Sequence, residues 1–143
     1  MTFKEEHGDL FGVDFKTWTP AHCISLDCKM GAGIAVPMKK KFKLGGLVDV
    51  VKENNWAIKV GSCVYHNGVL NLITKKKFYG KPTYDTLRES LVSMVWHCHE
   101  KEIKNIVMPK IGSGLDRLQW SRVREIIQDV FKDMDVNILV RVR

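Results

Sequence analysis

The sequence of 143 residues has no run that approaches 18 consecutive apolar residues, so we expect no membrane-spanning segment and no membrane partner. The first residues, "MTFKEEHGDL", lack a cationic start followed by an apolar stretch, and we therefore expect no secretory signal peptide. The sequence also has no repeat, no low-complexity tract and no linker. With 45% hydrophobic residues, it has the size and composition of a single domain spanning residues 1–143.

Cysteine is scarce, and the four cysteines are too few and too scattered to form a disulfide framework. We therefore expect reduced thiols and a nuclear or cytoplasmic protein. The segments "HC" at His22 and "HCH" at His97–His99 contain residue types that bind metals. However, the spacing from Cys23 to Cys28 is wider than in a zinc knuckle, and Cys98 falls on the apolar face of a predicted helix. We expect no metal and no other cofactor.

Two common nucleotide-binding motifs are also missing. The sequence contains neither G-x-x-x-x-G-K-[ST] nor G-x-G-x-x-G, which argues against a P-loop ATPase and against a Rossmann dehydrogenase.

Positive charge is abundant, with a formal net charge of +7. The lysines cluster in "KKKFK" at Lys39–Lys43 and in "TKKKFYGK" at Thr74–Lys81. Such clusters can be solvated surfaces, or they can attract nucleic acid, nucleotides or acidic protein surfaces. The aromatic residues that interleave with lysines in nucleic-acid stacking platforms are few here.

Hydrophobic periodicity predicts alternating helices and strands, hence an α/β layered fold. The Asn67-Gly68 dipeptide lies between two β-prone runs and predicts a type I′ hairpin, which would make the sheet mixed. Thr83 is the expected N-cap of a long amphipathic helix that follows Pro82. The other predicted strands are Thr2–Glu6, Ala21–Ser25, Asn105–Met108 and Val136–Val140, and the other predicted helices are Ala32–Phe42, Leu47–Asn54 and Trp120–Phe131.

Two glycine-containing loops each follow a predicted strand and precede a predicted helix. Their sequences are "CKMGAGIA" and "KIGSGLD". Ligands of open α/β sheets bind at the carboxyl ends of strands, where glycine permits close backbone approach and helix N-termini offer free N–H groups. One such loop is commonly only a turn, but two in a small domain indicate a ligand with two phosphates.

Two charged residues near these loops are candidates for chemistry. A carboxylate beside bound phosphate is repelled, so Asp116 either caps a helix or contacts the sugar part of a nucleotide ligand. Lys81 precedes Pro82 and lies close to a helix N-terminus, whose positive end favours a neutral, nucleophilic amine. The sequence pattern by itself does not separate Lys81 from the lysines at 75–77.

Four blocks together resemble the macrodomain family, specifically its branch of terminal ADP-ribose protein glycohydrolases, also described as O-acyl-ADP-ribose deacylases. They are "GDLF", "AHCISLDCKMGAGIA", "LITKK" with "GKPTY", and "MPKIGSGLDRLQW", in this order along nearly the whole chain. The resemblance implies a three-layer α/β/α sandwich around a mixed sheet of roughly six strands. It also implies a hydrolase, most simply a monomer, whose partners are ADP-ribose and ADP-ribosylated proteins.

The resemblance also implies roles for individual residues. Lys81 would attack C1″ of the distal ribose and expel the carboxylate of a modified side chain, and Asp116 would assist proton transfer and resolve the lysyl intermediate. Asp9 and Leu10 would face the adenine, and both glycine loops would surround the diphosphate and the distal ribose. The implied ligand-binding residues of the loops and the C-terminus are Ser25, Gly31, Ala32, Gly33, Ile34, Lys110, Ile111, Gly112, Ser113, Gly114, Leu115 and Arg143.

The chain departs from the family pattern at two places. Arg141 and Arg143 stand near the C-terminus, where the relative has an aromatic and an apolar residue. The asparagine-rich motif of hydrolases that use an activated water is absent, and Asp27, Cys28 and Lys29 stand there instead, which favours the lysine route. Two alternatives stay open, namely a non-catalytic ADP-ribose reader and a hydrolase of ADP-ribose linked to nucleic acid.

Overall fold

The computed structural model describes residues 1–143 and contains one six-stranded sheet in the order β1-β6-β5-β2-β4-β3. Every neighbouring pair is parallel except β3 and β4, which are antiparallel, so the predicted mixed sheet is confirmed. The strands are β1 (Thr2–His7), β2 (Thr19–Ser25), β3 (Cys63–His66), β4 (Val69–Lys75), β5 (Asn105–Met108) and β6 (Asn137–Val142).

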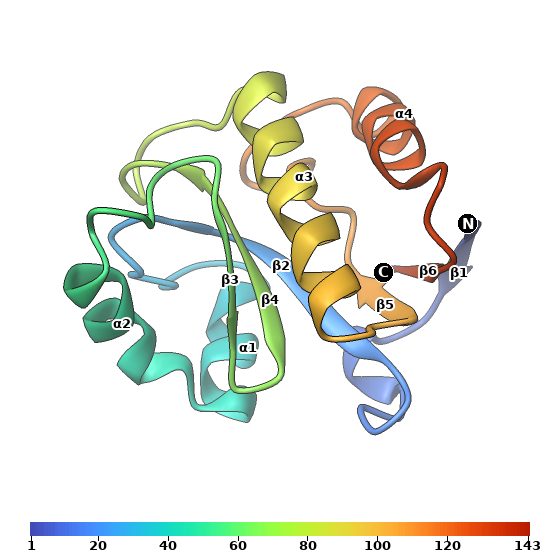
Figure 1. Cartoon of the computed structure of the whole chain (residues 1–143), viewed down its shortest axis with the longest axis horizontal. Helices are drawn as coiled ribbons and strands as arrows, with labels where there is room; N and C mark the ends of the chain where they lie inside the picture. The colour runs from blue at the N-terminus through green and yellow to red at the C-terminus, as the bar shows by residue number, and fades with distance from the viewer.

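Helices cover both faces of the sheet (Figure 1). On β4, Leu70 and Leu72 belong to the apolar cluster that contains α3 and α4, whereas Val69 and Ile73 belong to the cluster that contains α1 and α2. This alternation is the period of two that a strand buried on both faces must have. The helices are α1 (Ala35–Phe42), α2 (Leu47–Glu53), α3 (Tyr84–Glu100) and α4 (Trp120–Phe131), with short 3₁₀ turns at Leu10–Gly12 and Leu44–Gly46. The three-layer α/β/α architecture is therefore confirmed.

Two local predictions are confirmed in detail. Asn67 and Gly68 both have positive φ, 48° and 77°, as a type I′ turn requires. Thr83 caps α3 by accepting a hydrogen bond from the N–H of Thr86, whose side chain in turn accepts from the N–H of Thr83. These contacts fix the start of α3 directly after the segment that carries Lys81.

Several element boundaries differ from the predictions. Helix α1 begins at Ala35 rather than Ala32, because Gly33 has a φ of +62° that no helix accommodates. Pro37 lies in the first turn of α1, where its missing N–H costs nothing. Strand β2 begins two residues earlier than predicted because Thr19 and Pro20 pair with β5. The predicted strand near the C-terminus is shifted to Asn137–Val142, paired with β1.

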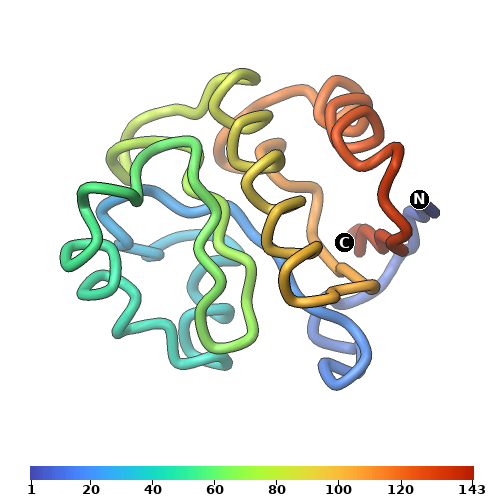
Figure 2. The backbone as a smooth tube through the Cα atoms, in the orientation of Figure 1, coloured from blue at the N-terminus to red at the C-terminus, as the bar shows by residue number.

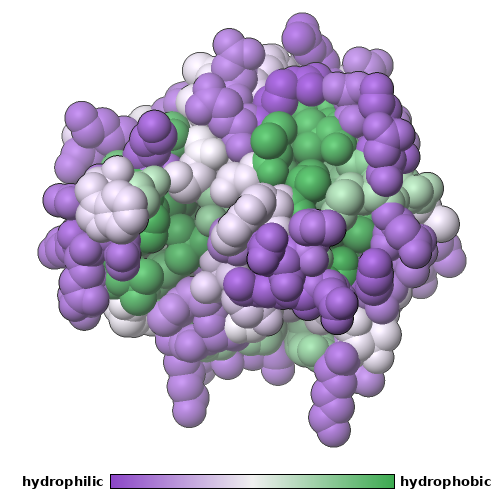
Figure 3. Space-filling view, viewed as in Figure 1, coloured by the Kyte–Doolittle hydropathy of each residue, from purple (hydrophilic) through white to green (hydrophobic).

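The two ends of the chain lie at the same edge of the sheet, where β1 pairs with β6 (Figure 2). Hydrophilic side chains project around the face shown in Figure 3, and the apolar atoms on it gather in separate areas. None of the helices combines the length and the apolar character that crossing a membrane demands.

Candidate active site

A cleft of about 950 Å³ lies at the carboxyl ends of β2, β4 and β5, between the two glycine loops. It forms there because these three strands are parallel neighbours, so the loops that follow them leave the same edge of the sheet. Nineteen residues line it. The predicted site residues among them are Ser25, Gly31, Ala32, Gly33, Ile34, Lys81, Lys110, Gly112, Gly114, Leu115 and Asp116.

The loop after β2 has an unusual backbone. Cys28 and Met30 have positive φ values of 55° and 49°, and Gly33 has 62°. A positive φ costs a non-glycine residue roughly 1–2 kcal/mol, and the burial of the Cys28 and Met30 side chains in the α1–α2 core offsets that cost. With those side chains turned inward, the segment from Gly31 to Gly33 borders the cleft.

The loop after β5 is anchored in the core and extends toward the loop after β2. Its Ile111 side chain is buried in the core, and Gly112, with a φ of +72°, accepts a hydrogen bond from the N–H of Leu118 at 2.7 Å. The Leu115 side chain lies opposite Gly33, since a Cβ added to Gly33 would lie 3.2 Å from Leu115 Cδ1. The two loops thus come together over the cleft.

Asp116 is not a helix cap. Helix α4 begins at Trp120 with Gln119 as its N-cap, and no side chain caps it. Instead, Oδ1 of Asp116 accepts a hydrogen bond from Nζ of Lys75 at 2.7 Å, and the two side chains are only 16% and 15% exposed. Oδ2 of Asp116 has no partner within the protein and is available to a ligand in the cleft.

Lys81 reaches the same end of the cleft from the segment that precedes α3. Its Nζ donates a hydrogen bond to the backbone oxygen of Leu115 at 2.9 Å. Leu115 is the residue before Asp116, so this contact brings the amine of Lys81 to the backbone beside the carboxylate. The amine remains exposed and forms no ion pair.

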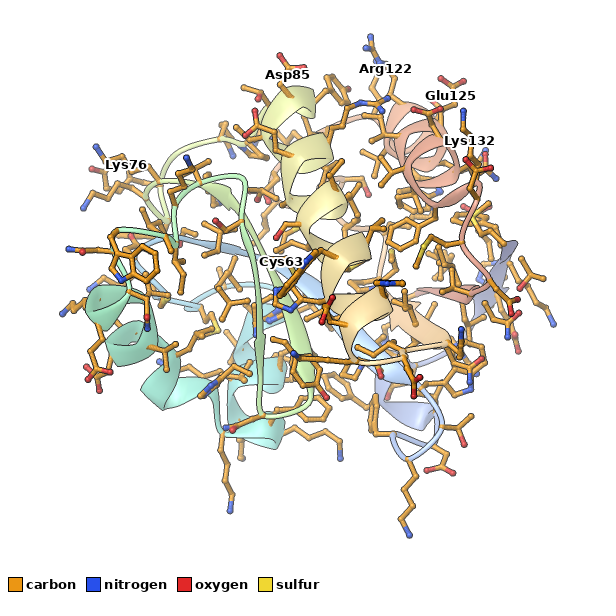
Figure 4. The ribbon with its side chains drawn as sticks, viewed as in Figure 1. Cys63, Lys76, Asp85, Arg122, Glu125 and Lys132 are labelled. Atoms are coloured by element: carbon orange, nitrogen blue, oxygen red, sulfur yellow. The ribbon has the colours of Figure 1, made fainter.

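The structure narrows the choice among the lysines. Lys75 and Lys81 line the cleft, whereas Lys76 and Lys77 do not. Figure 4 shows Lys76 pointing away from the body of the protein. The sequence analysis proposed no role for Lys75, whose position at the carboxyl end of β4, next to Ser25 of β2, brings it into the site.

Positive charge dominates the cleft. Four lysines line it, whereas Asp116 is its one acidic residue. Since Lys75 is paired with Asp116, the other three lysines are without an ionic partner. These three are Lys29, Lys81 and Lys110. A site with this charge and with glycine backbone at its walls suits an anionic ligand such as a diphosphate.

The cleft also contains a thiol, Cys23. Burial, reinforced by the Asp116 carboxylate, raises the pKa of Cys23 to about 12, so the thiol stays protonated at neutral pH and is a poor nucleophile. Next to it in β2, His22 is fully buried and bonded through Nε2 to Asn71 Oδ1 at 2.7 Å. No three His, Cys, Asp or Glu side chains lie together in a way that could hold a metal ion.

Comparison with known proteins gives the family. The Macro domain model matches residues 27–127. ADP-ribose glycohydrolase OARD1 of Homo sapiens is 45% identical over 139 residues, covering 93% of this chain and 86% of that protein. The chain belongs to the macro domain family. The macrodomain of Thermus aquaticus DarG has the same fold, with a TM-score of 0.83 and 19% identity over 98% of this chain and 97% of that one.

A further solved structure, Thermosipho africanus DarTG in complex with ADP-ribose, matches with a TM-score of 0.80 and 17% identity. The match covers 99% of this chain and 42% of that one. At this level of identity the likeness shows the fold alone.

Five predicted ligand residues do not line the cleft of this macro domain. Asp9 is exposed and accepts a hydrogen bond from the N–H of Phe11 at 3.0 Å, while Leu10 is buried against the α1–α2 core. The Ile111 side chain is in the opposite core, and the Ser113 hydroxyl donates to the carbonyl of Lys110 at 2.8 Å. Arg143 is exposed at the chain end. Their contacts with a ligand stay predictions.

Proposed function

We propose that this macro domain is an ADP-ribose glycohydrolase that releases ADP-ribose from carboxylate side chains of proteins and deacylates O-acyl-ADP-ribose. One observation carries the proposal: Lys81 and the Lys75–Asp116 pair lie at one end of a cationic cleft bounded by two glycine loops. The name and 45% identity of the human relative support the same activity.

Binding relies mainly on backbone and charge. The loops at residues 31–34 and 110–115 present glycine backbone to the diphosphate, and Lys29 and Lys110 provide compensating positive charge. The distal ribose then lies at the end of the cleft where Lys81 and Asp116 meet. Asp116 therefore faces the sugar rather than the phosphates, which removes the repulsion that a carboxylate would otherwise experience.

The reaction has two stages, a covalent attack and a hydrolysis. The neutral amine of Lys81 attacks C1″, the bond from C1″ to the ester oxygen breaks, and its electron pair leaves with the acceptor carboxylate. Oδ2 of Asp116 accepts the proton lost by the nitrogen. The bond from C1″ to the ring oxygen then breaks, the second nitrogen proton passes to that oxygen, and the adduct becomes an imine.

Water adds across the imine, placing its hydroxyl on C1″ and its other proton on the nitrogen. Asp116 protonates the nitrogen, the bond from C1″ to nitrogen breaks as the hydroxyl proton passes to Asp116, and the aldehyde closes to the ribose ring of ADP-ribose. Asp116 then loses that proton to water, which restores Lys81 as the neutral amine.

A reader module that binds ADP-ribose without hydrolysis is the main alternative, and it would need no nucleophile beside an ion-paired carboxylate. The basic surface, with its net charge of +7, also suits ADP-ribose carried on nucleic acid. The reader differs from the proposed enzyme because it has no turnover, and the nucleic-acid hydrolase differs in its leaving group. One assay therefore separates the three functions.

The test is a release assay on ADP-ribose esterified to glutamate, O-acetyl-ADP-ribose, ADP-ribosylated nucleobase and ADP-ribose-1″-phosphate. We expect release from the two esters, and a loss of at least about 10²-fold in Lys81→Ala. Lys76→Ala is the matched control, because it removes a neighbouring lysine that does not line the cleft. Tight ADP-ribose binding without any release would show a reader, and release from the nucleobase alone would show a nucleic-acid substrate.

A further inference from the structure

A second, smaller pocket of about 420 Å³ adjoins the cleft. We call it the acceptor pocket, and it is formed by the loop after β2, helix α2 and the segment after β4. Lys29 and Phe78 line both the cleft and the acceptor pocket, so the two are adjacent. Phe78 lies three residues before Lys81, and both residues line the cleft.

The acceptor pocket has an excess of positive charge. Lys29, Lys52 and Lys77 line it, and none of them has a carboxylate within ion-pair distance. Its one acidic residue is Asp27. Burial opposes ionisation of Asp27, but hydrogen bonds from the Ser25 hydroxyl and from backbone N–H groups outweigh it and lower the pKa, so Asp27 remains a carboxylate.

Asp27 also builds the pocket. Its Oδ2 accepts a hydrogen bond from the N–H of Phe78 at 2.9 Å and its Oδ1 accepts one from the N–H of Lys29 at 3.3 Å. These bonds tie the loop after β2 to the segment after β4. The Phe78 and Tyr79 rings, 56% and 73% exposed, contact each other edge to face at 5.2 Å and form an apolar wall beside the lysines.

We propose that the acceptor pocket binds the acidic peptide segment that flanks the ADP-ribosylated residue. The inference rests on the proposed function, because a group esterified to C1″ must leave the cleft near Lys81, and the segment just before Lys81 lines the pocket through Lys77, Phe78 and Tyr79. Lys52 and Lys77 then attract carboxylates near the modified side chain, and Phe78 and Tyr79 contact its aliphatic parts. The protein would therefore prefer modified sites in acidic sequences.

The fixed carboxylate of Asp27 favours a peptide over nucleic acid. A nucleic-acid strand carries a charge at every nucleotide, so a phosphate would be repelled near Asp27. A peptide can place its carboxylates opposite the lysines and its neutral N–H groups near Asp27. A single aromatic pair is also a small stacking platform for successive bases.

The experiment compares two peptides of equal length that carry ADP-ribose on one glutamate, one with acidic and one with neutral flanking residues. The variant is the double change Lys52→Glu with Lys77→Glu, neither of which lines the cleft. The control, Lys40→Glu with Lys76→Glu, makes the same change in net charge at exposed lysines outside both pockets. Each protein is assayed for kcat/KM on both peptides and on O-acetyl-ADP-ribose.

We expect the native protein to prefer the acidic peptide by about fivefold at low salt, since exposed ion pairs contribute little individually. The preference should vanish in the Lys52/Lys77 variant, persist in the control and shrink as salt is added. Activity on O-acetyl-ADP-ribose should be unchanged in both. Equal kcat/KM for the two peptides in the native protein would overturn the proposal, and so would an equal loss in the control.

Two further arms separate the possible failures. The first arm uses an ADP-ribosylated single-stranded oligonucleotide. If the native protein prefers this substrate over the acidic peptide, and the Lys52/Lys77 variant loses that preference, the peptide assignment is overturned. Anisotropy of a fluorescent acidic peptide, measured with saturating ADP-ribose, tests the pocket without turnover. If no ester is hydrolysed but the peptide binds through Lys52 and Lys77, the proposed function fails and the pocket stands. If the acidic peptide does not bind either, the assignment of the pocket as a peptide site is overturned.

Discussion

Nζ of Lys75 lies 2.7 Å from Oδ1 of Asp116, joining the end of β4 to the loop that carries the carboxylate. Lys75 is held in place by the sheet, since its carbonyl accepts a hydrogen bond from the N–H of Leu26 at 2.9 Å and it pairs with Ser25 of β2. Asp116, by contrast, lies in a loop next to Arg117, whose φ is +60°. The ion pair therefore anchors the carboxylate to a residue that the sheet holds in place.

From this pair we expect Lys75→Met to reduce turnover mainly through kcat, by about 10–100-fold, with ADP-ribose affinity changed much less. Removing one partner of a shielded ion pair also lowers the free energy of unfolding by about 1–3 kcal/mol. Lys75→Arg should recover part of kcat, because a guanidinium can still bind the carboxylate. Steady-state kinetics and calorimetry measure both quantities. Unchanged kcat in a folded Lys75→Met protein would show that Asp116 needs no support.

Lys81→Ala and Asp116→Ala should fail at different stages of the reaction. Lys81→Ala should bind ADP-ribose but form no covalent adduct. Asp116→Ala should slow breakdown of the adduct more than its formation, and loss of such an acid/base group typically costs about 10²–10⁴ in rate. Intact-protein mass spectrometry after borohydride treatment should therefore detect trapped ADP-ribose in Asp116→Ala alone.

Peptide mapping then identifies the nucleophile. An adduct on Lys81 is expected. An adduct on Lys75, the cleft lysine that pairs with Asp116, would reverse the roles of Lys75 and Lys81. Full activity of Lys81→Ala on the glutamate ester would instead favour an activated water.

The glycine loops offer a way to separate ligand binding from folding. An added Cβ at Gly114 meets no atom within 4 Å, and the backbone there is not in the left-handed region. Gly114→Val should therefore keep the native Tm while its side chain fills the cleft and weakens ADP-ribose binding by at least about tenfold, equivalent to about 1.4 kcal/mol. Thermal unfolding and calorimetric titration test the two halves. Native affinity in the folded variant would remove this loop from the binding site.

Gly112→Ala is the contrasting substitution. Its φ of +72° and the contact of an added Cβ with Leu118 Cδ1 at 3.1 Å make the native backbone unfavourable for alanine. We expect a loss of roughly 1–2 kcal/mol in unfolding free energy, visible as a lower urea midpoint. A native midpoint would mean that the loop relaxes without cost.

The lowered pKa of His22 predicts how the free energy of unfolding depends on pH. Burial lowers its pKa to about 4, opposed by the hydrogen bond with Asn71, whereas in the unfolded chain the ordinary value is about 6.5. The unfolded state therefore binds more protons between these values, so His22's contribution is complete above pH 6.5 and falls as pH decreases toward 4. The loss between pH 8 and pH 5 is about 2 kcal/mol.

His22→Gln cannot titrate and keeps an amide that can donate to Asn71. Urea unfolding at pH 8 and pH 5 should show a smaller decrease for this variant than for the native protein. Parallel decreases would mean that other groups, and not His22, set the acid sensitivity.

Local chemistry determined what the sequence alone could predict. Asn67-Gly68 forms a type I′ turn because few other residues accept positive φ at both positions. Thr83 caps α3 because its hydroxyl lies within reach of an N–H three residues later. The strands and helices on either side likewise predict where the two glycine loops lie. The number of strands followed from the family resemblance rather than from the pattern, and the strand order was given only by the structure.

The site's chemistry depended on contacts between distant parts of the chain. Alternation along β4 would give Lys75 the same face as Ile73, but the pairing with β2 shifts by one residue between Ile24 and Ser25, and Lys75 lines the cleft. Its partner Asp116 is 41 residues away. Neither the shift nor the pairing has a local signature, because both arise only when β2, β4 and β5 lie side by side and their loops meet. The tertiary structure therefore decided which lysine pairs with Asp116.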